Sequence, residues 1–411
     1  MSSGNFLDKL LDGVGVEWKE LGDVAEYVRG LVYNKSSESS DGTGFKVLRA
    51  NNITLTGNSL NFDDIKVVNF DTKVKKSQKL YKNDILISAA SGSREHVGKV
   101  AFINEDIDFY FGGFMAVVRC GTKLNPRFVF HILTSQLFQN YLNEMLNSST
   151  INNLSSSVMG LFKIPIPCPE NPKKSLEIQA EIVRILDTFT ELTTELTTEL
   201  TTELNLRKKQ YNHYRDQLLS FEDGKVEWKT LGETCGVITG GEAPASGLMS
   251  RAPTNIYKYP IYGNGADVYG YTDSYKIDKD VVTISSIGAN TGTVYFRKAY
   301  FTPIIRLKVL MPKNERIHPR YLFHVLSSLT IGRKSSSVPN MNAADVKRIS
   351  IPVPSVETQA RIVAILDKFD ALTTSLTEGL PREIELRQRQ YAHYRDLLLS
   401  FPKPTQAGEC P

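Results

Sequence analysis

Residues 190–204 read TELTTELTTELTTEL, and this stretch decides how the rest of the chain is organised. Its leucines, Leu192, Leu196, Leu200 and Leu204, are four residues apart, and each follows a glutamate. Four residues turn an α-helix by about 400°, so the leucines form one slowly drifting apolar stripe beside an acidic stripe. Threonine is a poor helix former, so a helix this rich in threonine is expected to lie against a partner surface. A flexible low-complexity linker is the alternative.

The sequences that flank the repeat occur twice, 180 residues apart. LRKKQYNHYRDQLLSF begins at Leu206 and LRQRQYAHYRDLLLSF at Leu386, while LEIQAEIVRILD begins at Leu176 and VETQARIVAILD at Val356. The intervening segments are equal in length. The apolar stripe continues in the second copy as Leu372, Leu376, Leu380 and Ile384. We therefore expect two equivalent long helices that pack as an antiparallel, coiled-coil-like pair.

The ends of the two helices are also marked in the sequence. Ser175 and Ser355 stand where an N-cap is expected, each followed by a glutamate in the first turn. The second copy contains Gly379 and Pro381, which predict a break or bend there.

A second repeat precedes each helix. VEWKELG begins at Val16 and VEWKTLG at Val226, and residues 7–13, LDKLLDG, resemble the end of a helix copy. The order domain, helix, domain, helix is therefore cyclic, and the two ends of the chain are expected to lie close together.

The two segments between the helices share a skeleton despite low identity. Residues 83–103 resemble residues 279–297, and residues 126–135 match residues 319–328, which are expected to form a buried helix. Each segment closes with a strand-like piece, KIPIP or RISIPVP. Strands and helices are mixed without a βαβ cadence, which predicts two globular α+β domains in a pseudo-two-fold arrangement.

The composition is that of an ordinary globular chain. The 411 residues suit two or three domains. No apolar run approaches a membrane span, and the N-terminus lacks the features of a signal peptide, so a cytoplasmic protein is expected. Cys120, Cys168, Cys235 and Cys410 are far apart, which predicts reduced thiols and no structural metal.

The net charge of +4 is distributed unevenly. Residues 241–350 hold 15 Lys and Arg against 7 Asp and Glu, and residues 30–160 hold 14 against 11, so the remainder, mainly the helices, is acidic. Basic globular parts on acidic helices favour a polyanionic partner.

Loop side chains of the two domains suit contact with nucleic acid, because Arg and Asn read base edges while Ser and Thr hold phosphates. In the first domain the candidates are Arg49, Asn51, Asn52, Ser91, Ser93, Arg94, His96, Asn152, Asn153 and Ser155. In the second they are Tyr262, Asn264, Ser285, Ser286, Asn290, Thr291, Arg333, Lys334, Ser335 and Asn340. Gly92 and Gly98 are expected to serve backbone geometry.

Catalytic motifs are missing from the sequence. There is no (D/N)PP(Y/F) methylation motif, and residues 92–99 do not have the spacing of a Walker A loop. His131 and His324 occupy matching positions in the expected buried helices, which favours a structural role over a catalytic one.

The duplicated helices and VEWK motifs resemble the specificity subunits of type I restriction–modification systems, particularly the IC-like group with tetrapeptide repeats. The resemblance covers the whole chain. It implies two target recognition domains, each reading half of a bipartite double-stranded DNA sequence. It also implies helices that space the domains and bind two modification subunits, which in turn recruit two restriction subunits. The cofactors S-adenosylmethionine, ATP and Mg are expected on those partners and none on this chain.

This resemblance sets the expected boundaries and roles. Target recognition domains are predicted at 1–162 and 223–347, and helical spacers at 163–222 and 348–411. Candidates for spacing and assembly are the eight residues of the apolar stripe together with Tyr211, Tyr214, Tyr391 and Tyr394.

Three functions are weighed on these grounds. The favoured one is a non-catalytic subunit that gives DNA sequence specificity. A self-sufficient DNA enzyme would need cofactor or metal motifs that the sequence lacks. A coiled-coil scaffold with domains that bind protein or glycan would bind its ligand independently of salt.

Overall fold

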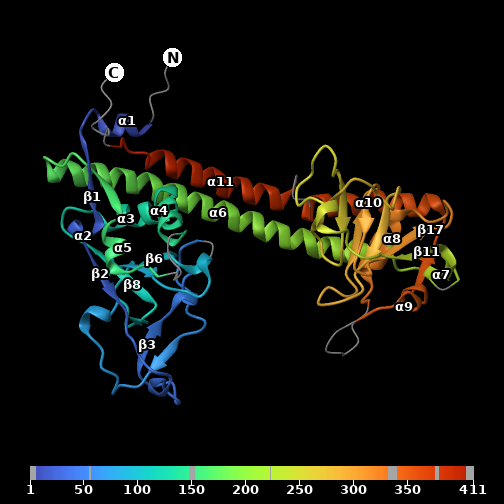
Figure 1. The fold of residues 1–411 in the computed structure, drawn as a ribbon, viewed down its shortest axis with the longest axis horizontal. Helices are drawn as coiled ribbons and strands as arrows, with labels where there is room; N and C mark the ends of the chain where they lie inside the picture. The colour runs from blue at the N-terminus through green and yellow to red at the C-terminus, as the bar shows by residue number, and fades with distance from the viewer. Residues whose placement is uncertain are drawn as a thin grey trace. The chain divides into compact units, whose positions relative to one another are not determined.

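The computed structural model describes residues 6–54, 57–147, 153–222, 224–331, 340–374 and 379–403. The chain divides into two compact units (Figure 1). The first consists of residues 1–197 and 385–411, and the second of residues 198–384. The second unit is thus one continuous segment, whereas the first is assembled from both ends of the chain.

The first unit contains a domain that runs from β1 to β9, called the first domain below. Its strands are β1 (Val16–Glu20), β2 (Ala25–Arg29), β3 (Phe45–Leu48), β4 (Lys66–Val68), β5 (Ile85–Ser88), β6 (Val100–Phe102), β7 (Tyr110–Phe111), β8 (Met115–Cys120) and β9 (Lys163–Pro167). Its helices are α2 (Leu21–Val24), α3 (Pro126–Thr134), α4 (Gln136–Asn147) and α5 (Ser156–Gly160), with α1 (Phe6–Leu11) before it. Short 3₁₀ turns are η1 (Lys35–Ser37), η2 (Ala50–Asn52), η3 (Lys76–Gln78) and η4 (Arg94–His96).

The second unit contains the corresponding second domain, from β10 to β18. Its strands are β10 (Glu227–Thr230), β11 (Cys235–Thr239), β12 (Tyr259–Tyr262), β13 (Val268–Thr272), β14 (Val281–Ile284), β15 (Val294–Arg297), β16 (Thr302–Pro303), β17 (Lys308–Pro312) and β18 (Ser350–Val353). Its helices are α7 (Leu231–Thr234), α8 (Pro319–Ser328) and α9 (Ala343–Lys347), with the turn η5 (Ser246–Leu248).

The two domains have the same topology, as the sequence predicted. A four-stranded antiparallel sheet has the order β2-β8-β5-β6 in the first domain and β11-β17-β14-β15 in the second. A three-stranded sheet, β4-β3-β7 or β13-β12-β16, contains one parallel pair in each case. The repeated VEWK motif is a strand that pairs with the closing strand of its own domain, β1 with β9 and β10 with β18.

The long helices follow the duplicated sequence. The first copy is α6 (Pro172–Leu218), one helix of 47 residues that includes the whole TTEL repeat. The second copy is two helices, α10 (Val356–Thr374) and α11 (Leu380–Leu398), and Gly379 at the break has φ +83°. The predicted interruption is therefore confirmed.

One predicted helix start is confirmed and the other is wrong. The hydroxyl of Ser355 accepts a hydrogen bond from the backbone N–H of Thr358, which makes Ser355 the N-cap of α10. In the first copy α6 begins earlier, at Pro172, and the side chain of Asn171 accepts from the backbone N–H of Lys174. Ser175 lies buried inside the helix, because Asn followed by Pro is a stronger start signal than Ser alone.

The core of the first unit joins the two ends of the chain. Leu7 and Leu11 of α1 are buried in one cluster with Leu398, Leu399 and Phe401 from the end of α11. The corresponding residues of α6, Leu218, Leu219 and Phe221, pack against the core of the second unit. The indole N–H of Trp18 donates to the carbonyl oxygen of Pro402 at 2.7 Å, so the first and last described segments of the chain lie close together, as predicted.

Candidate nucleic-acid interface

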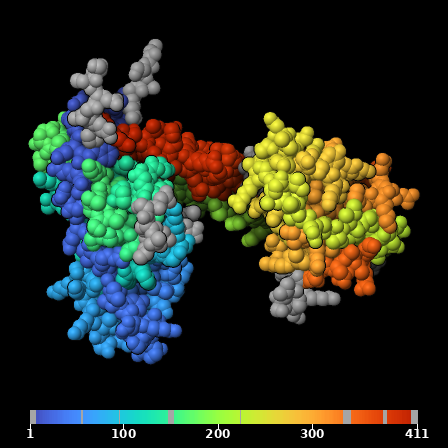
Figure 2. Space-filling view, viewed as in Figure 1, coloured from blue at the N-terminus to red at the C-terminus, as the bar shows by residue number. Residues whose placement is uncertain are grey.

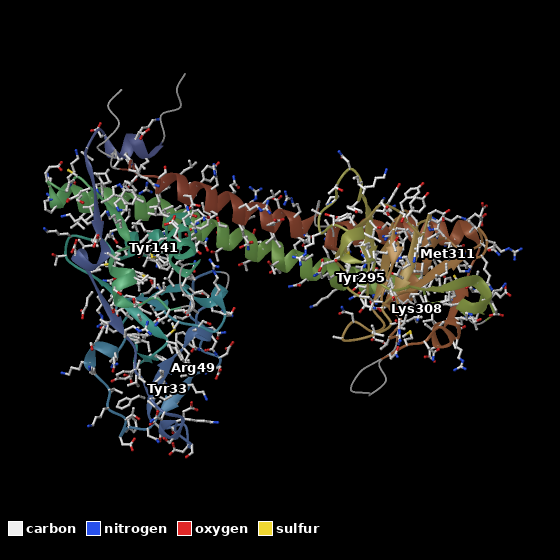
Figure 3. The ribbon with its side chains drawn as sticks, in the orientation of Figure 1. Tyr33, Arg49, Tyr141, Tyr295, Lys308 and Met311 are labelled. Atoms are coloured by element: carbon white, nitrogen blue, oxygen red, sulfur yellow. The ribbon has the colours of Figure 1, made fainter. Side chains whose placement is uncertain are left out.

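The first domain carries a groove of about 790 Å³ at the end where β3 lies. Figure 3 labels Tyr33 and Arg49 at this end of the first unit, opposite to α6 and α11 in Figure 1, and Figure 2 shows the same end in blue. The groove is lined by Leu31, Val32, Tyr33, Lys35, Glu38, Arg49, Ala50, Asn51, Ala90, Ser91, Gly92, Gly112, Gly113, Phe114 and Met115. Three predicted contact residues, Arg49, Asn51 and Ser91, are therefore brought together from two loops.

The turn η2 gives its three candidate residues different roles. Asn52 is buried, accepts from the backbone N–H of Arg49, and donates to the carbonyl oxygens of Asn61 and Asp64. Arg49 and Asn51 both donate to the carboxylate of Asp64, at 2.7 and 3.0 Å. Asn52 thus shapes the turn, whereas Arg49 and Asn51 line the groove and are held by Asp64.

The loop between β5 and β6 divides its candidates between two cavities. Ser91 lines the groove, whereas Ser93 and Arg94 line a separate cavity of about 510 Å³ beside α4. Arg94 donates to the side chain of Asn143 at 3.1 Å. His96 is half-buried in η4, and Gly98 has φ +83°, which fits the expected backbone role of that glycine.

Asn153 and Ser155 lie where the chain returns to the first domain. The side-chain oxygen of Asn153 accepts from Arg29 at 3.2 Å, and Ser155 is the N-cap of α5. Arg29 also donates to the carbonyl oxygens of Leu154 and Gly113. Arg29 was not predicted, because nothing in the strand sequence shows that its guanidinium joins these segments. Asn152 lies outside the described residues.

In the second domain, three predicted contact residues bond to one another. Asn264 donates to the carbonyl oxygen of Ile305 at 2.5 Å, and its side-chain oxygen accepts from the backbone N–H of Ser286 at 2.7 Å. Its backbone carbonyl accepts from the hydroxyl of Ser285 at 2.6 Å. Ser285 and Ser286 are fully buried, so these side chains hold three segments together.

The ring of Tyr262 packs against Arg297, a residue that the sequence did not identify as part of the site. The guanidinium of Arg297 stacks on the rings of Tyr262, at 3.9 Å from the centroid, and Tyr295, at 4.6 Å. It donates to the carbonyl oxygens of Gly265 and Ala266, which fixes the loop after β12. Burial lowers the pKa of Arg297 and outweighs the opposing effects of Tyr262, Tyr295 and Asp267.

The remaining candidates of the second domain are spread over its loops. Thr291 donates to the carbonyl oxygen of Gly288 at 2.7 Å, and Asn290 beside it is exposed. Asn340 is exposed and bridges to Ile287. Arg333, Lys334 and Ser335 lie outside the described residues.

Each domain is fixed to the helix that follows it by the same set of contacts, called the helix clamp below. In the first unit, Gln179 accepts from the backbone N–H of Asn125, and Asp187 accepts from Arg127 at 3.0 Å and from His131 at 2.8 Å. In the second unit, Gln359, Asp367, Arg320 and His324 repeat this arrangement, with His324 at 2.7 Å and Arg320 at 2.6 Å from Asp367.

The surroundings of the clamp histidines disfavour their charged form, and burial lowers the pKa of His131 as well as that of His324. Burial lowers the pKa of His324 and outweighs the opposing effect of Asp367. Because the ionised carboxylate of Asp367 can only accept, Nε2 of His324 donates to it, and the hydroxyl of Tyr211 lies 3.2 Å from Nδ1. Burial also opposes ionisation of Asp367, but donors from Arg320 and His324 keep its pKa below the ordinary value.

The helix surfaces repeat a second contact. In the first unit Phe189 of α6 stacks on Tyr394 of α11 at 5.9 Å, and in the second Phe369 of α10 stacks on Tyr214 of α6 at 5.5 Å. Within the first unit the hydroxyl of Tyr391 also lies 2.9 Å from that of Thr190. These contacts pack α6 against α11 in opposite directions there (Figure 1).

The apolar stripe of the repeat is not uniformly covered. Leu192 is exposed, while the stripe residues that are half-buried are Leu196, Leu200, Leu204, Leu372, Leu380 and Ile384. Leu376 lies outside the described residues.

The described residues contain no group of three or more His, Cys, Asp or Glu side chains arranged to hold a metal ion. Cys120, Cys168 and Cys235 are free thiols. In the same part of the chain, no helix combines the length and apolarity that a membrane span requires.

Comparison with known proteins agrees with the duplicated architecture. The family model described as "Type I restriction modification DNA specificity domain" matches residues 13–206 and again residues 224–386. The specificity subunit of the type I restriction enzyme EcoR124I/EcoR124II of Escherichia coli is 36% identical, over 98% of this chain and 99% of that protein. The specificity subunit of EcoprrI, also from Escherichia coli, is 34% identical over 92% and 93% of the two chains.

A solved structure has the same fold. A chain in a structure of the type I R-M system aligns with a TM-score of 0.65 at 17% identity, covering 94% of this chain and 97% of the other. The two matches of the family model each begin near one VEWK motif, cover one domain, and end within the helices that follow it, at residues 206 and 386. The chain therefore belongs to the type I restriction–modification DNA specificity family and gives DNA sequence specificity within a restriction–modification complex.

Proposed function

We propose that each of the two domains reads one half of an asymmetric, bipartite sequence in double-stranded DNA. The observation that carries this proposal is one frame bearing two different sets of loops. The helix clamp and the strand order of the sheets are repeated, whereas the loops differ: Arg49 and Asn51 bond to Asp64 in the first domain, and Asn264 bonds to Ile305 and Ser286 in the second. Equivalent frames with different loops are suited to two readers of different sequences.

The helices then set the distance between the half-sites and recruit the catalytic partners. α6, α10 and α11 present surfaces to two modification subunits, and two restriction subunits join through these. The exposed side chains of Leu192 and Leu206 support this role, because apolar residues on a helix surface are suited to a protein partner. The chain itself is non-catalytic, and S-adenosylmethionine, ATP and Mg are bound by the partners.

The domain boundaries follow the same proposal. Residues 1–162 and 223–347 act as target recognition domains, and residues 163–222 and 348–411 as helical spacers. The basic balance of residues 241–350 supports a role in DNA contact, since it favours a polyanion.

Sequencing the methylome of cells that express this chain with its modification subunit tests the proposal. The expected result is a two-part motif, with one methylated adenine in each half and an unread gap between them. A continuous motif, or no motif from a modification subunit that is active with another specificity subunit, would contradict it.

A further inference from the structure

Both domains carry a short segment with buried ends and a more exposed middle, called the tip below, at an equivalent position where a strand of the four-stranded sheet begins. The tip comprises residues 112–115 in the first domain and 304–307 in the second. Gly30 donates through its backbone N–H to Met115 in the first domain, and Gly240 donates to Leu307 in the second. Both segments also form a parallel bridge with the residue after that glycine. Phe114 therefore corresponds to Arg306.

The tip of the second domain has a costly backbone conformation. Ile305 and Arg306 have φ of +52° and +60°, a region that β-branched and bulky residues rarely adopt. Such a conformation persists only where neighbouring groups hold it, and it is enriched at functional sites. Here Asn264 donates to the carbonyl oxygen of Ile305 and Ser286 to that of Arg306.

The tip thus explains what the buried polar residues of the second domain do. Asn264 and Ser286 hold the backbone of the tip with their side chains, so those groups are occupied within the domain. The side chains that the tip turns outward are Ile305, which is 40% exposed, and Arg306, which is also exposed. The polar side chains of these loops therefore hold the backbone that presents Arg306 to solvent.

The charge around the second tip favours a ligand rich in acceptors. Arg306 has no acidic partner among the described residues. Lys308, two residues further along, is buried and donates only to the hydroxyl of Thr239, at 3.2 Å. Burial lowers the pKa of Lys308. The positive charge of Arg306 repels that of Lys308 and lowers this pKa further. An acceptor at Arg306 would relieve this repulsion.

The first tip offers different chemistry on the same frame. Phe114 is 71% exposed and Val32 beside the tip is 84% exposed, so both are large apolar side chains left in solvent. Gly113 allows this approach, because a Cβ there would lie 2.9 Å from the side chain of Val32. Arg29 donates to the carbonyl oxygen of Gly113 at 3.0 Å, which places a cation beneath the tip.

We propose that the two tips are specificity-determining contacts, with Arg306 reading a base edge in one half-site and Phe114 making apolar contact with bases in the other. Arginine pairs with the acceptors of guanine in the major groove, and an exposed aromatic residue contacts thymine methyl groups or wedges between base steps. This proposal rests on the proposed function, and it names which side chains read the DNA.

The test compares Arg306→Gln and Phe114→Ala in the full complex, by methylome sequencing and by methylation rates on both half-sites. Each variant is expected to relax the motif at one position or a few adjacent positions of a single half. Methylation at cognate sites should fall roughly tenfold or more, as for loss of one good base contact. The two variants should affect opposite halves. Arg316→Gln, at an exposed arginine beside the start of α8, is the matched control and should leave the motif unchanged.

Other outcomes overturn the proposal. The proposal is wrong if the methylated motif stays unchanged in both variants. This holds also if methylation falls equally at all sites, because an equal fall indicates a lost phosphate contact and not a lost base contact. Relaxation of the same half by both variants would also overturn the proposal. Arg306→Asn, whose side chain tolerates the left-handed backbone, repeats the test with a variant that keeps the fold of the tip. Absence of a bipartite motif in the unaltered complex would instead overturn the proposed function.

Discussion

At the scale of single residues, the same polar side chain can read a ligand or hold a loop, and only its surroundings decide. Asn51 and Asn52 are adjacent, yet Asn51 faces the groove while Asn52 is buried and bonded to the backbone on both sides of its turn. Asn264 shows the same inward use. Sequence chemistry therefore named candidate loops but could not separate residues that are free to contact a ligand from residues that shape the backbone.

The lowered pKa of His324 predicts that stability depends on pH. The pKa of His324 is lowered by folding, so the unfolded chain binds the proton first as pH falls below 6.5. Above that pH, His324 does not reduce the free energy of unfolding of the second unit. Below it, the free energy of unfolding should decrease as pH falls, by at most about 1.4 kcal/mol per pH unit for His324. The Trp18→Phe background leaves Trp228 as the single indole, so urea unfolding followed by tryptophan fluorescence reports on the second unit.

His324→Gln in the same background is the control for this pH dependence. Its stability should change less between pH 7.5 and pH 5.5 than that of the parent. Equal slopes for the two proteins would show that His324 is not the group responsible.

Two neighbouring glycines provide a matched test of packing at the second tip. A Cβ on Gly240 would lie 2.9 Å from the backbone N and O of Ile304, whereas one on Gly241 would meet only the end of Lys276 at 3.8 Å. Gly240→Ala should destabilise the second unit by about 1–3 kcal/mol, as overpacking does. Gly241→Ala should change its stability by less than roughly 0.5 kcal/mol. Urea unfolding monitored through Trp228 measures both, and equal effects would contradict the packing.

At the scale of elements, the helices were the most predictable part, because their information is local and duplicated. The repeat, the break at Gly379 and the cap at Ser355 all follow from short-range chemistry. The tips were not predicted, because residues 112–115 and 304–307 share almost no sequence. Their equivalence arises from backbone hydrogen bonds to Gly30 and Gly240, which are distant in the chain.

The threonines of α6 show how a poor helix-forming sequence remains helical. The hydroxyls of Thr190, Thr194 and Thr197 donate to the carbonyl oxygens four residues earlier. Their hydrogen bonds are therefore made within the helix and need no partner from another element. The repeat can therefore change in number without leaving unpaired polar groups.

Removing one TTEL unit should change the spacing of the target but not its half-sites. One unit adds about 6 Å of helix, against 3.4 Å per base-pair step, so the unread gap should shorten by one or two base pairs. Methylome sequencing measures the gap. A length-preserving change of one unit from TTEL to AAEL is the control and should leave the gap unaltered, while a fixed gap in the deletion would contradict the spacer role.

At the scale of the whole molecule, the two units have the same parts in a different chain order. The second unit is continuous, whereas the first takes its closing helix from the end of the chain. A circular permutant that joins the ends by a short linker and opens between Gly224 and Lys225 should fold and direct methylation of the same motif. Gly224 has φ +80° and lies between α6 and β10, outside any strand pair.

A permutant opened between Ile164 and Pro165 is the matched control. This cut falls inside β9 and should disrupt its pairing with β1. Methylation by the control, or its loss in the Gly224 permutant, would show that the cyclic order does not govern folding.

During synthesis the first domain is made before the second, yet its hydrophobic core is incomplete until the last helix has been made. Leu398, Leu399 and Phe401 complete that core, while every residue of the second unit has already been synthesised by residue 384. A chain that ends near residue 384 therefore contains the whole second unit but leaves apolar surface of the first core uncovered. Premature release of the chain near residue 384 would leave the first domain with an incomplete core and the second domain with all of its residues.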